Sequence, residues 1–284
     1  MHYKHILLYK GKETDKIAEA TRTIKQWCEN HGVPLRKVSN QKNVEKIAKE
    51  SGKKTVLLSL GGDGTFLRAA DLIAPYCIPI LGINLGKLGF LTGLDSSELA
   101  QNLTRVLDKG SSVRELTRLQ CSSDSIQSGG SSVFTALNEV TITRGTTAGL
   151  AEVELYLDSK KVATYPGDGL IVSTPTGSTA YSLSCGGPLI TRNTSAFSIT
   201  PLNVHKLGLR PIICSDETEI SIKTNTPVSI QIDGRNIGDL EKNNSIEIDR
   251  ADTPTLMLVP DFRSNFFETV RNKLNWDKDR GSRI

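Results

Sequence analysis

The sequence predicts two domains: an α/β N-terminal Rossmann-like domain, then a β-rich, β-sandwich-like C-terminal domain. Apolar strands alternate with helical patterns up to Gly110, which is typical of an open α/β sheet. From Ser111 onward, β-branched runs separated by Gly, Asp, Asn and Pro replace this alternation. Helical periodicity returns over Asp261–Trp276, and we expect this C-terminal tail to pack back on the first domain. The expected boundaries are 1–112 for the α/β domain, 113–259 for the β-rich domain and 260–284 for the returning segment.

Composition indicates a globular protein with a core of ordinary size. Of the 284 residues, 37% are apolar and 23% are charged, and no apolar run approaches the length of a membrane span. The N-terminus has only four apolar residues in a row, fewer than a signal peptide needs. The five cysteines are odd in number and far apart, so neither a disulfide framework nor a zinc site is predicted. These features favour a cytoplasmic protein that binds no membrane.

The charge balance argues against a nucleic-acid partner. The chain carries 35 Lys and Arg against 31 acidic residues, a formal net charge of +4, with only short basic clusters. Small anionic ligands such as nucleotides remain possible.

The elements of the first domain follow from short apolar strands and helical spacing. Ile6–Tyr9 predicts a strand, and helical periodicity then continues to Gly32. Further strands are expected at Val33–Val38, Thr55–Leu60 and Ile78–Ile83, with a short helix around Val44–Ala48. Because parallel strands end at the same edge, the loops that follow them should share one crevice.

The loop Gly61-Gly-Asp-Gly-Thr65 follows the most apolar of these strands. Its glycines allow a sharp turn and leave backbone amides uncovered, and helical spacing resumes from Phe66. The loop matches neither the Walker pattern nor the dinucleotide Gly-x-Gly-x-x-Gly pattern. Asp63 would repel a phosphate unless a metal lay between them or the carboxylate accepted a proton from an attacking hydroxyl. Phosphoryl transfer to an alcohol is therefore one interpretation, and a simple helix cap is the other.

Two polar segments stand out in the β-rich domain. The run from Asp168 to Pro188 offers many hydroxyls and glycine-freed amides, which suit neutral binding of ribose, amide and phosphate groups. A connecting turn rich in Ser and Thr is the alternative. Asn138-Glu139 lies between apolar β segments and, taken alone, would more often be a turn than a site.

Taken together and in order, these motifs resemble those of the NAD kinase family. The motifs are Gly61–Thr65, Asn138-Glu139, Asp168-Gly169 and the run Thr174-Pro-Thr-Gly-Ser-Thr-Ala-Tyr-Ser-Leu-Ser184. The Gly-Gly-Asp-Gly part also occurs in lipid and sugar kinases, whereas the Thr174 run is much narrower. The resemblance covers nearly the whole chain.

The resemblance implies ATP-dependent phosphorylation of the 2′-hydroxyl on the adenosine ribose of NAD, giving NADP, with a divalent metal ion such as Mg²⁺. It assigns Asp63 as the proton acceptor, Gly64 to the phosphates and Arg68 to the neighbourhood of the phosphate acceptor. It implies no protein ligand for the metal. The residues implied in binding NAD are Asp63, Gly64, Arg68, Asn138, Glu139, Asp168, Thr176, Thr179, Ala180, Tyr181, Ser182, Leu183 and Ser184, with Asp233 and Arg235 as weaker matches.

The resemblance also implies a homo-oligomer, a dimer or a tetramer. The chain departs from the family pattern at Pro166 and Gly149, where relatives often carry an arginine and a histidine. Two other functions stay open from the residues alone: a lipid or sugar kinase of the Gly-Gly-Asp-Gly group, and a non-catalytic NAD(P)-binding sensor.

Overall fold

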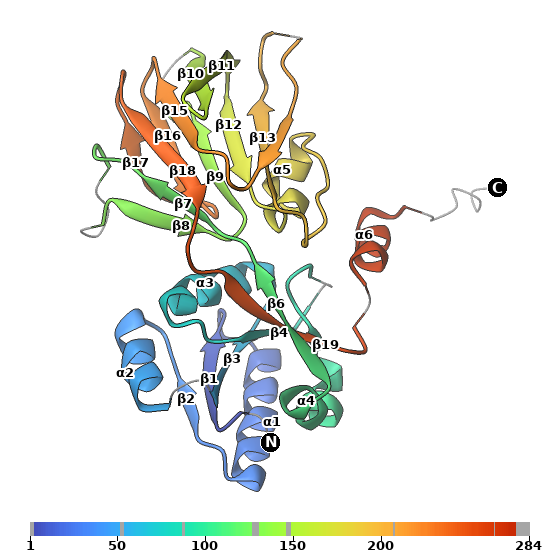
Figure 1. Cartoon of the computed structure of the whole chain (residues 1–284). Helices are drawn as coiled ribbons and strands as arrows, with labels where there is room; N and C mark the ends of the chain where they lie inside the picture. The colour runs from blue at the N-terminus through green and yellow to red at the C-terminus, as the bar shows by residue number, and fades with distance from the viewer. Residues whose placement is uncertain are drawn as a thin grey trace, which may run out of the picture. The chain divides into compact units, whose positions relative to one another are not determined.

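The computed structural model describes residues 3–51, 54–86, 89–126, 131–145, 149–206, 208–263 and 265–276. The chain divides into two compact units, one formed by Met1–Glu115 with Thr255–Ile284 and the other by Leu116–Pro254 (Figure 1).

A mostly parallel sheet forms the centre of the first unit. Its strand order is β2-β1-β3-β4-β19-β6, and β5 pairs with β4 beside this path. Strands β1, β2, β3, β4, β5 and β19 pair with one another in parallel. The strands are β1 (His5–Lys10), β2 (Leu35–Lys37), β3 (Thr55–Leu60), β4 (Ile80–Asn84), β5 (Leu94–Asp95), β6 (Ser111–Leu116) and β19 (Thr255–Pro260).

Helices cover this sheet on both sides, as the continuous apolar strands require. Every residue of β3 and β4 is buried, the pattern of strands enclosed on both faces. Alternate strand residues such as Ile6 and Leu58 share one apolar cluster with Ile24 and Leu103 of α1 and α4, while α2 and α3 lie on the other side (Figure 1). The helices are α1 (Asp15–His31), α2 (Gln41–Ser51), α3 (Asp63–Ile73), α4 (Leu99–Asp108) and α6 (Phe266–Leu274), with short 3₁₀ turns η2 (Ala74–Tyr76) and η3 (Ser96–Glu98).

The ends of two helices show how the local sequence determines their boundaries. The Thr14 hydroxyl accepts from the backbone N–H of Ile17 at the start of α1, and Gly32 ends the helix at φ 63°. At α6, Asn265 and Glu268 form a reciprocal capping box.

Strand β19 corrects the sequence-based boundary between the units. The expected second domain, 113–259, includes this strand, but β19 pairs in parallel with β4 through Met257 and Ile80. Strand β6 crosses the expected boundary at residue 112 and also belongs to the first sheet. A short apolar strand has the same sequence pattern in either sheet, so the local pattern does not predict which strands it pairs with.

The second unit consists of two six-stranded sheets. Their orders are β11-β10-β15-β18-β7-β8 and β14-β13-β12-β9-β16-β17, and the neighbouring strands within each sheet pair antiparallel. The strands are β7 (Leu119–Ser122), β8 (Val133–Ala136), β9 (Glu139–Thr143), β10 (Ala151–Leu157), β11 (Lys160–Gly167), β12 (Gly169–Ser173), β13 (Ala196–Leu202), β14 (Ile212–Ser215), β15 (Ile220–Thr224), β16 (Val228–Ile232), β17 (Arg235–Leu240) and β18 (Ser245–Arg250). Figure 1 shows them as two layers.

One apolar core joins these two sheets. Val153, Leu155 and Ile222 of one sheet pack in the same cluster as Val172 and Ile230 of the other. The expected β-sandwich-like domain is confirmed. The segment after β12 is an exception to the all-β pattern, since it forms the short helices η4 (Gly177–Thr179) and α5 (Tyr181–Ser184).

None of the helices in the described part of the chain combines the length and the apolar character that a membrane span requires.

Candidate functional site

Asp63 is the first residue of helix α3, directly after the glycine turn that ends β3. Gly62 is the N-cap, with an extended backbone and no side-chain cap, and the amides of Thr65 and Phe66 return to its carbonyl. The cap position is therefore occupied by Gly62 and not by Asp63, which argues against the simpler of the two interpretations of this residue. Helix geometry leaves the first N–H groups, those of Asp63 and Gly64, without a carbonyl partner inside the helix.

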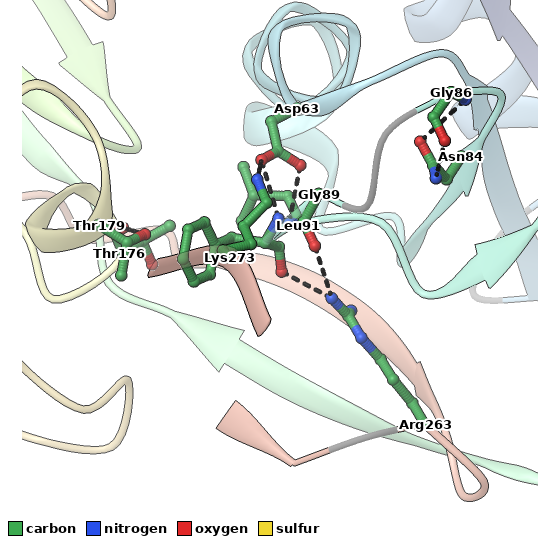
Figure 2. Close-up of polar contacts among 10 residues, drawn as sticks. Asp63, Asn84, Gly86, Gly89, Leu91, Thr176, Thr179, Arg263 and Lys273 are labelled. Carbon is green, nitrogen blue, oxygen red and sulfur yellow. Dashed lines mark hydrogen bonds and ion pairs between the residues drawn. The ribbon is translucent and has the colours of Figure 1, made fainter. Parts of the chain in front are cut away.

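Two backbone amides of the loop that follows β4 hold the Asp63 carboxylate. Its Oδ2 accepts from the Phe90 amide at 2.8 Å, and its Oδ1 accepts from the Leu91 amide at 2.9 Å (Figure 2). The expected crevice shared by two loops thus includes direct contact between them. Each oxygen keeps a second lone pair, so the carboxylate can still accept a proton or a hydrogen bond from a ligand.

The C-terminal segment supplies two basic residues to this loop pair. Arg263 donates from Nη2 to the carbonyl oxygens of Phe90 at 2.8 Å and Gly89 at 3.5 Å. Lys273 lies on α6, with Nζ 3.8 Å from Asp63 Oδ2 and 4.6 Å from the centre of the Phe90 ring (Figure 2). Burial lowers the pKa of Arg263 to about 10, although the nearby Asp63 carboxylate opposes this shift.

Sequence reasoning missed both basic residues. The only signal was the helical periodicity of Asp261–Trp276 and its expected return to the first domain, which names a segment but no contact. The C-terminal segment returns to the first unit as expected, and the unexpected strand β19 returns with it; this return brings the two side chains to Asp63.

The other predicted residues of this unit lie on the open side of α3. A methyl group placed on Gly62 or Gly64 would meet nothing within 4 Å, so the turn has room for a ligand. Arg68 is exposed one turn further along the helix. By contrast, Gly61 has a φ of 155° and packs against Thr65, where a Cβ would come 2.3 Å from the Thr65 hydroxyl.

In the second unit, strand direction gathers three of the predicted segments. Strand β9 runs antiparallel to both β12 and β16, with Glu139 opposite Ser173 and Val140 opposite Ile232. The start of β9 therefore lies beside the ends of β12 and β16. Asn138-Glu139, the run after Ser173 and the turn at Asp233 consequently meet at one end of this sheet.

Asp233 organises that end of the sheet. Its Oδ2 accepts from the Leu137 amide at 2.8 Å, and its Oδ1 accepts from the amides of Asn138 at 2.8 Å and Glu139 at 3.1 Å. Burial raises the pKa of Asp233, while these three amides and the charge of Arg118 lower it. The carboxylate thus turns toward the protein backbone. Its partner in the weaker prediction, Arg235, is exposed at the start of β17.

Glu139 has the most unusual electrostatic setting in this cluster. The residue is 6% exposed, and its Oε2 has no hydrogen-bond partner among the described residues. Burial, followed by the charge of Asp233, raises the pKa of Glu139 to about 8, against a lowering contribution from the backbone N–H of Tyr181. A carboxyl of this kind can donate a hydrogen bond as a neutral acid near pH 7.

Many hydroxyls of the Thr174 run have hydrogen-bond partners inside the protein, some of them outside the run. Thr174 Oγ1 donates to the Leu137 carbonyl at 2.6 Å and accepts from the Gly177 amide at 3.1 Å. Ser178 Oγ donates to the Pro175 carbonyl at 2.7 Å and accepts from the Ile190 amide at 3.0 Å, and Ser182 Oγ lies 3.1 Å from Thr200 Oγ1. These side chains are buried.

The remaining members of the run differ in exposure. Tyr181 is 47% exposed and Ser184 is exposed on α5, while Thr179, Ala180 and Leu183 are half-buried. Thr176 is buried, and its backbone carbonyl accepts from the Thr179 hydroxyl at 3.0 Å (Figure 2). The fold therefore leaves Tyr181 and Ser184 as the hydroxyls most open to a ligand.

Tyr181, Ser184 and Asp168 line one cavity of about 420 Å³. Asp168 lies between β11 and β12, where Oδ1 is 3.1 Å from Arg144 Nε and Oδ2 accepts from Asn203 Nδ2 at 2.8 Å. The volume lies in the range of small-molecule sites. Three predicted residues thus meet at one cavity, and the structure adds Arg144 and Asn203 to its lining.

The described residues contain no group of three or more His, Cys, Asp or Glu side chains that could hold a metal ion. The protein side chains of this part of the chain therefore do not form a dedicated metal cage.

The fold and the site together define a class of enzyme. One unit carries a carboxylate at the start of a helix that follows a glycine turn, and the other unit carries a polar cavity in a β-sandwich. This combination is expected of a nucleotide-dependent phosphotransferase. Sequence models of one family match both units. The model of the ATP-NAD kinase N-terminal domain matches residues 9–111, and that of the ATP-NAD kinase C-terminal domain matches residues 137–259.

Individual relatives agree with these matches. The chain is 42% identical over 232 residues to an NAD kinase of Moorella thermoacetica, covering 80% of this chain and 72% of the relative. It is 36% identical over 271 residues to an NAD kinase of Caldanaerobacter subterraneus, covering 92% and 95%. The chain therefore belongs to the ATP-NAD kinase family and is an enzyme of the kinase class.

Two solved structures share the fold. Yeast NADH kinase complexed with NADH superposes with a TM-score of 0.86 at 23% identity, covering 100% of this chain and 91% of that one. An NAD kinase from Archaeoglobus fulgidus in complex with ATP gives a TM-score of 0.78 at 24% identity, covering 94% and 98%. They confirm an α/β unit followed by a β-rich one.

Proposed function

We propose that this chain transfers the terminal phosphoryl group of ATP to the 2′-hydroxyl on the adenosine ribose of NAD, giving NADP, and that Asp63 accepts the proton of that hydroxyl. Membership of the ATP-NAD kinase family supports the overall reaction and favours it over a lipid or sugar kinase. The position of Asp63 carries the assignment of the base: a carboxylate oriented by two amides beside an open glycine turn.

The chemical step needs few protein groups. The O2′–H bond breaks and its proton passes to Asp63, a new bond forms between O2′ and the γ-phosphorus, and the bond from that phosphorus to the β-phosphate oxygen breaks with its electron pair leaving on ADP. The N–H groups of Asp63 and Gly64 at the start of α3 favour negative charge at this point. We assign Arg68, exposed on the same helix, to a phosphate group in the same neighbourhood.

We assign the dinucleotide to the polar end and the cavity of the second unit. Asn138 and the neutral form of Glu139 offer donors to ribose and amide groups. Asp168, Tyr181 and Ser184 surround a cavity large enough for part of the ligand. Asp233 contributes by holding the Asn138-Glu139 turn rather than by facing the ligand.

A divalent metal ion is expected to arrive with ATP. Mg²⁺ is usually held by substrate phosphates, water and one or two carboxylates, which is compatible with the absence of a three-residue acidic or thiol cluster among the described residues. We derive no step of the reaction from it. Like many enzymes of small metabolites, the protein is also expected to form a homo-oligomer.

The test is product identification with purified protein. With ATP, MgCl₂ and NAD, we expect NADP by chromatography and mass spectrometry, and chelation of divalent ions by EDTA should stop the reaction until MgCl₂ is restored. A parallel panel should replace ATP with other triphosphates or polyphosphate, and NAD with NADH. Tight NADP binding without turnover of any donor would instead identify a sensor.

The base assignment has its own measurement. Asp63→Asn keeps the size and one acceptor oxygen but removes the basic carboxylate, so kcat should fall by about 100-fold or more. The Asp71→Asn variant, on the same helix, is the matched control and should keep the parent rate. An Asp63→Asn enzyme with the parent kcat would remove this residue from the role of base.

A further inference from the structure

Lys273 places a positive charge beside the proposed base without being needed to hold it. The Asp63 oxygens already accept amide hydrogen bonds of 2.8 and 2.9 Å, whereas the Lys273 ammonium lies 3.8 Å from Oδ2, beyond hydrogen-bond distance. Both side chains are partly open to solvent, at 28% for Lys273 and 31% for Asp63. An ion pair of this kind contributes little to stability.

The position of the Lys273 ammonium is nevertheless defined by its neighbours. It lies over the Phe90 ring at 4.6 Å from the centroid, in the range of a cation–π contact. The amide of the same Phe90 binds Asp63, and its carbonyl binds Arg263, so the loop that orients the base also positions the cation. An ammonium has three donors, and the Phe90 ring and the distant carboxylate leave them available to a ligand.

The positive charge of Lys273 beside Asp63 reduces an electrostatic repulsion that the proposed reaction would otherwise meet. A carboxylate beside a phosphate repels it, and the repulsion is strongest when the γ-phosphoryl group and the acceptor hydroxyl are closest together. A fixed ammonium at the edge of the carboxylate offsets that repulsion while leaving the carboxylate ionised.

We propose that Lys273 is a phosphate-binding catalytic residue that contacts the terminal phosphate of the nucleoside triphosphate as it is transferred, a role that rests on the function proposed above. In this step the O2′ proton goes to Asp63, the O2′–phosphorus bond forms, and ADP leaves with the electron pair of the broken bond. Lys273 stays protonated throughout and donates to the oxygens of the transferring group. Helix α6 thereby contributes directly to the active site of the first unit.

The first experiment compares Lys273→Met with Lys273→Arg and Lys25→Met. Methionine keeps much of the side-chain length that packs on Phe90, arginine keeps the charge, and Lys25 makes a comparable surface ion pair, 3.7 Å from Glu29. We expect kcat to fall about 100-fold in Lys273→Met, to recover at least tenfold in Lys273→Arg, and to stay at the parent value in Lys25→Met. Thermal melting should show all three folded. A parent-like kcat in Lys273→Met would overturn the proposal.

The second experiment needs no turnover and separates this proposal from the function as a whole. Calorimetry without NAD should show that Lys273→Met weakens binding of a non-hydrolysable ATP analogue by five- to tenfold while ADP binding changes less than twofold. Equal weakening of both nucleotides, or of neither, would exclude a contact with the terminal phosphate. This result stands whichever acceptor the enzyme uses.

A double-mutant cycle tests the remaining alternative, that Lys273 acts only by holding Asp63. If that were so, Lys273→Met would have no further effect in an Asp63→Asn enzyme. A contact with the phosphate instead predicts a further loss of at least fivefold in the residual rate.

Discussion

The Gly89→Ala substitution tests the geometry on which the catalytic proposal depends. A Cβ at residue 89 would lie 2.2 Å from Asp63 Oδ1, 3.0 Å from Asp63 Cγ and 2.8 Å from the Thr92 hydroxyl. Contacts under 3.0 Å force a movement, and the atoms in the way are the ends of two short side chains rather than backbone. The carboxylate can therefore swing aside, and the fold should survive while the orientation of the base is lost.

The magnitudes of the two effects should differ widely. Swinging aside breaks the hydrogen bonds from Phe90 and Leu91, each worth about 1.5–3 kcal/mol to a charged acceptor. Because Asp63 is partly exposed and water replaces these donors, we expect a net loss of only about 1–2 kcal/mol. A displacement of about 1 Å at a reacting group can cost about 100-fold in rate, so kcat should fall by about that factor.

Urea unfolding and initial-rate measurements on the same preparation would check both numbers. Gly86→Ala is the matched control, since it lies in the same loop and a Cβ there meets nothing within 4 Å. Its kcat and stability should equal those of the parent. If Gly89→Ala kept the parent kcat, the amide-held orientation of Asp63 would not matter for the reaction.

Two further predictions concern the second unit. Because the pKa of Glu139 is raised to about 8, the folded protein binds more protons at this residue than the unfolded protein does between about pH 4.5 and 8. The free energy of unfolding therefore decreases as the pH rises through that window. Glu139→Gln should flatten this part of the curve of unfolding free energy against pH, and an unchanged slope would contradict the assignment. Asp233→Asn turns an NH₂ group or a single oxygen toward three amide donors, so it should cost about 2–4 kcal/mol in urea unfolding and raise the KM for NAD. The exposed Asp239→Asn on β17 is its control, and equal stability of the two variants would exclude the organising role of Asp233.

The comparison of sequence and structure separates what is local from what is not. The glycine turn after β3 and the helix that follows it were predicted, because an apolar strand, glycines and helical spacing can all be recognised within about 20 residues of sequence. The membership of β19 in the first sheet was not, because its pairing with β4 joins residues 177 positions apart at Met257 and Ile80. Similarly, the hydroxyls of Thr174, Ser178 and Ser182 form a polar run in the sequence, but only their burial shows that they bind the protein itself.

The sequence by itself determined the order of the motifs, the two fold classes and the residue types that phosphoryl transfer requires, since these depend on neighbours along the chain. The tertiary structure decided which groups surround each of them. Asp63 gained two amides and Lys273 from segments far along the chain, and Asp233, a weak ligand candidate in the sequence, accepts the amides of a turn. The physical reason is the same in each case: hydrogen-bond partners and electric fields act over a few ångströms in space, and sequence spacing does not measure that distance.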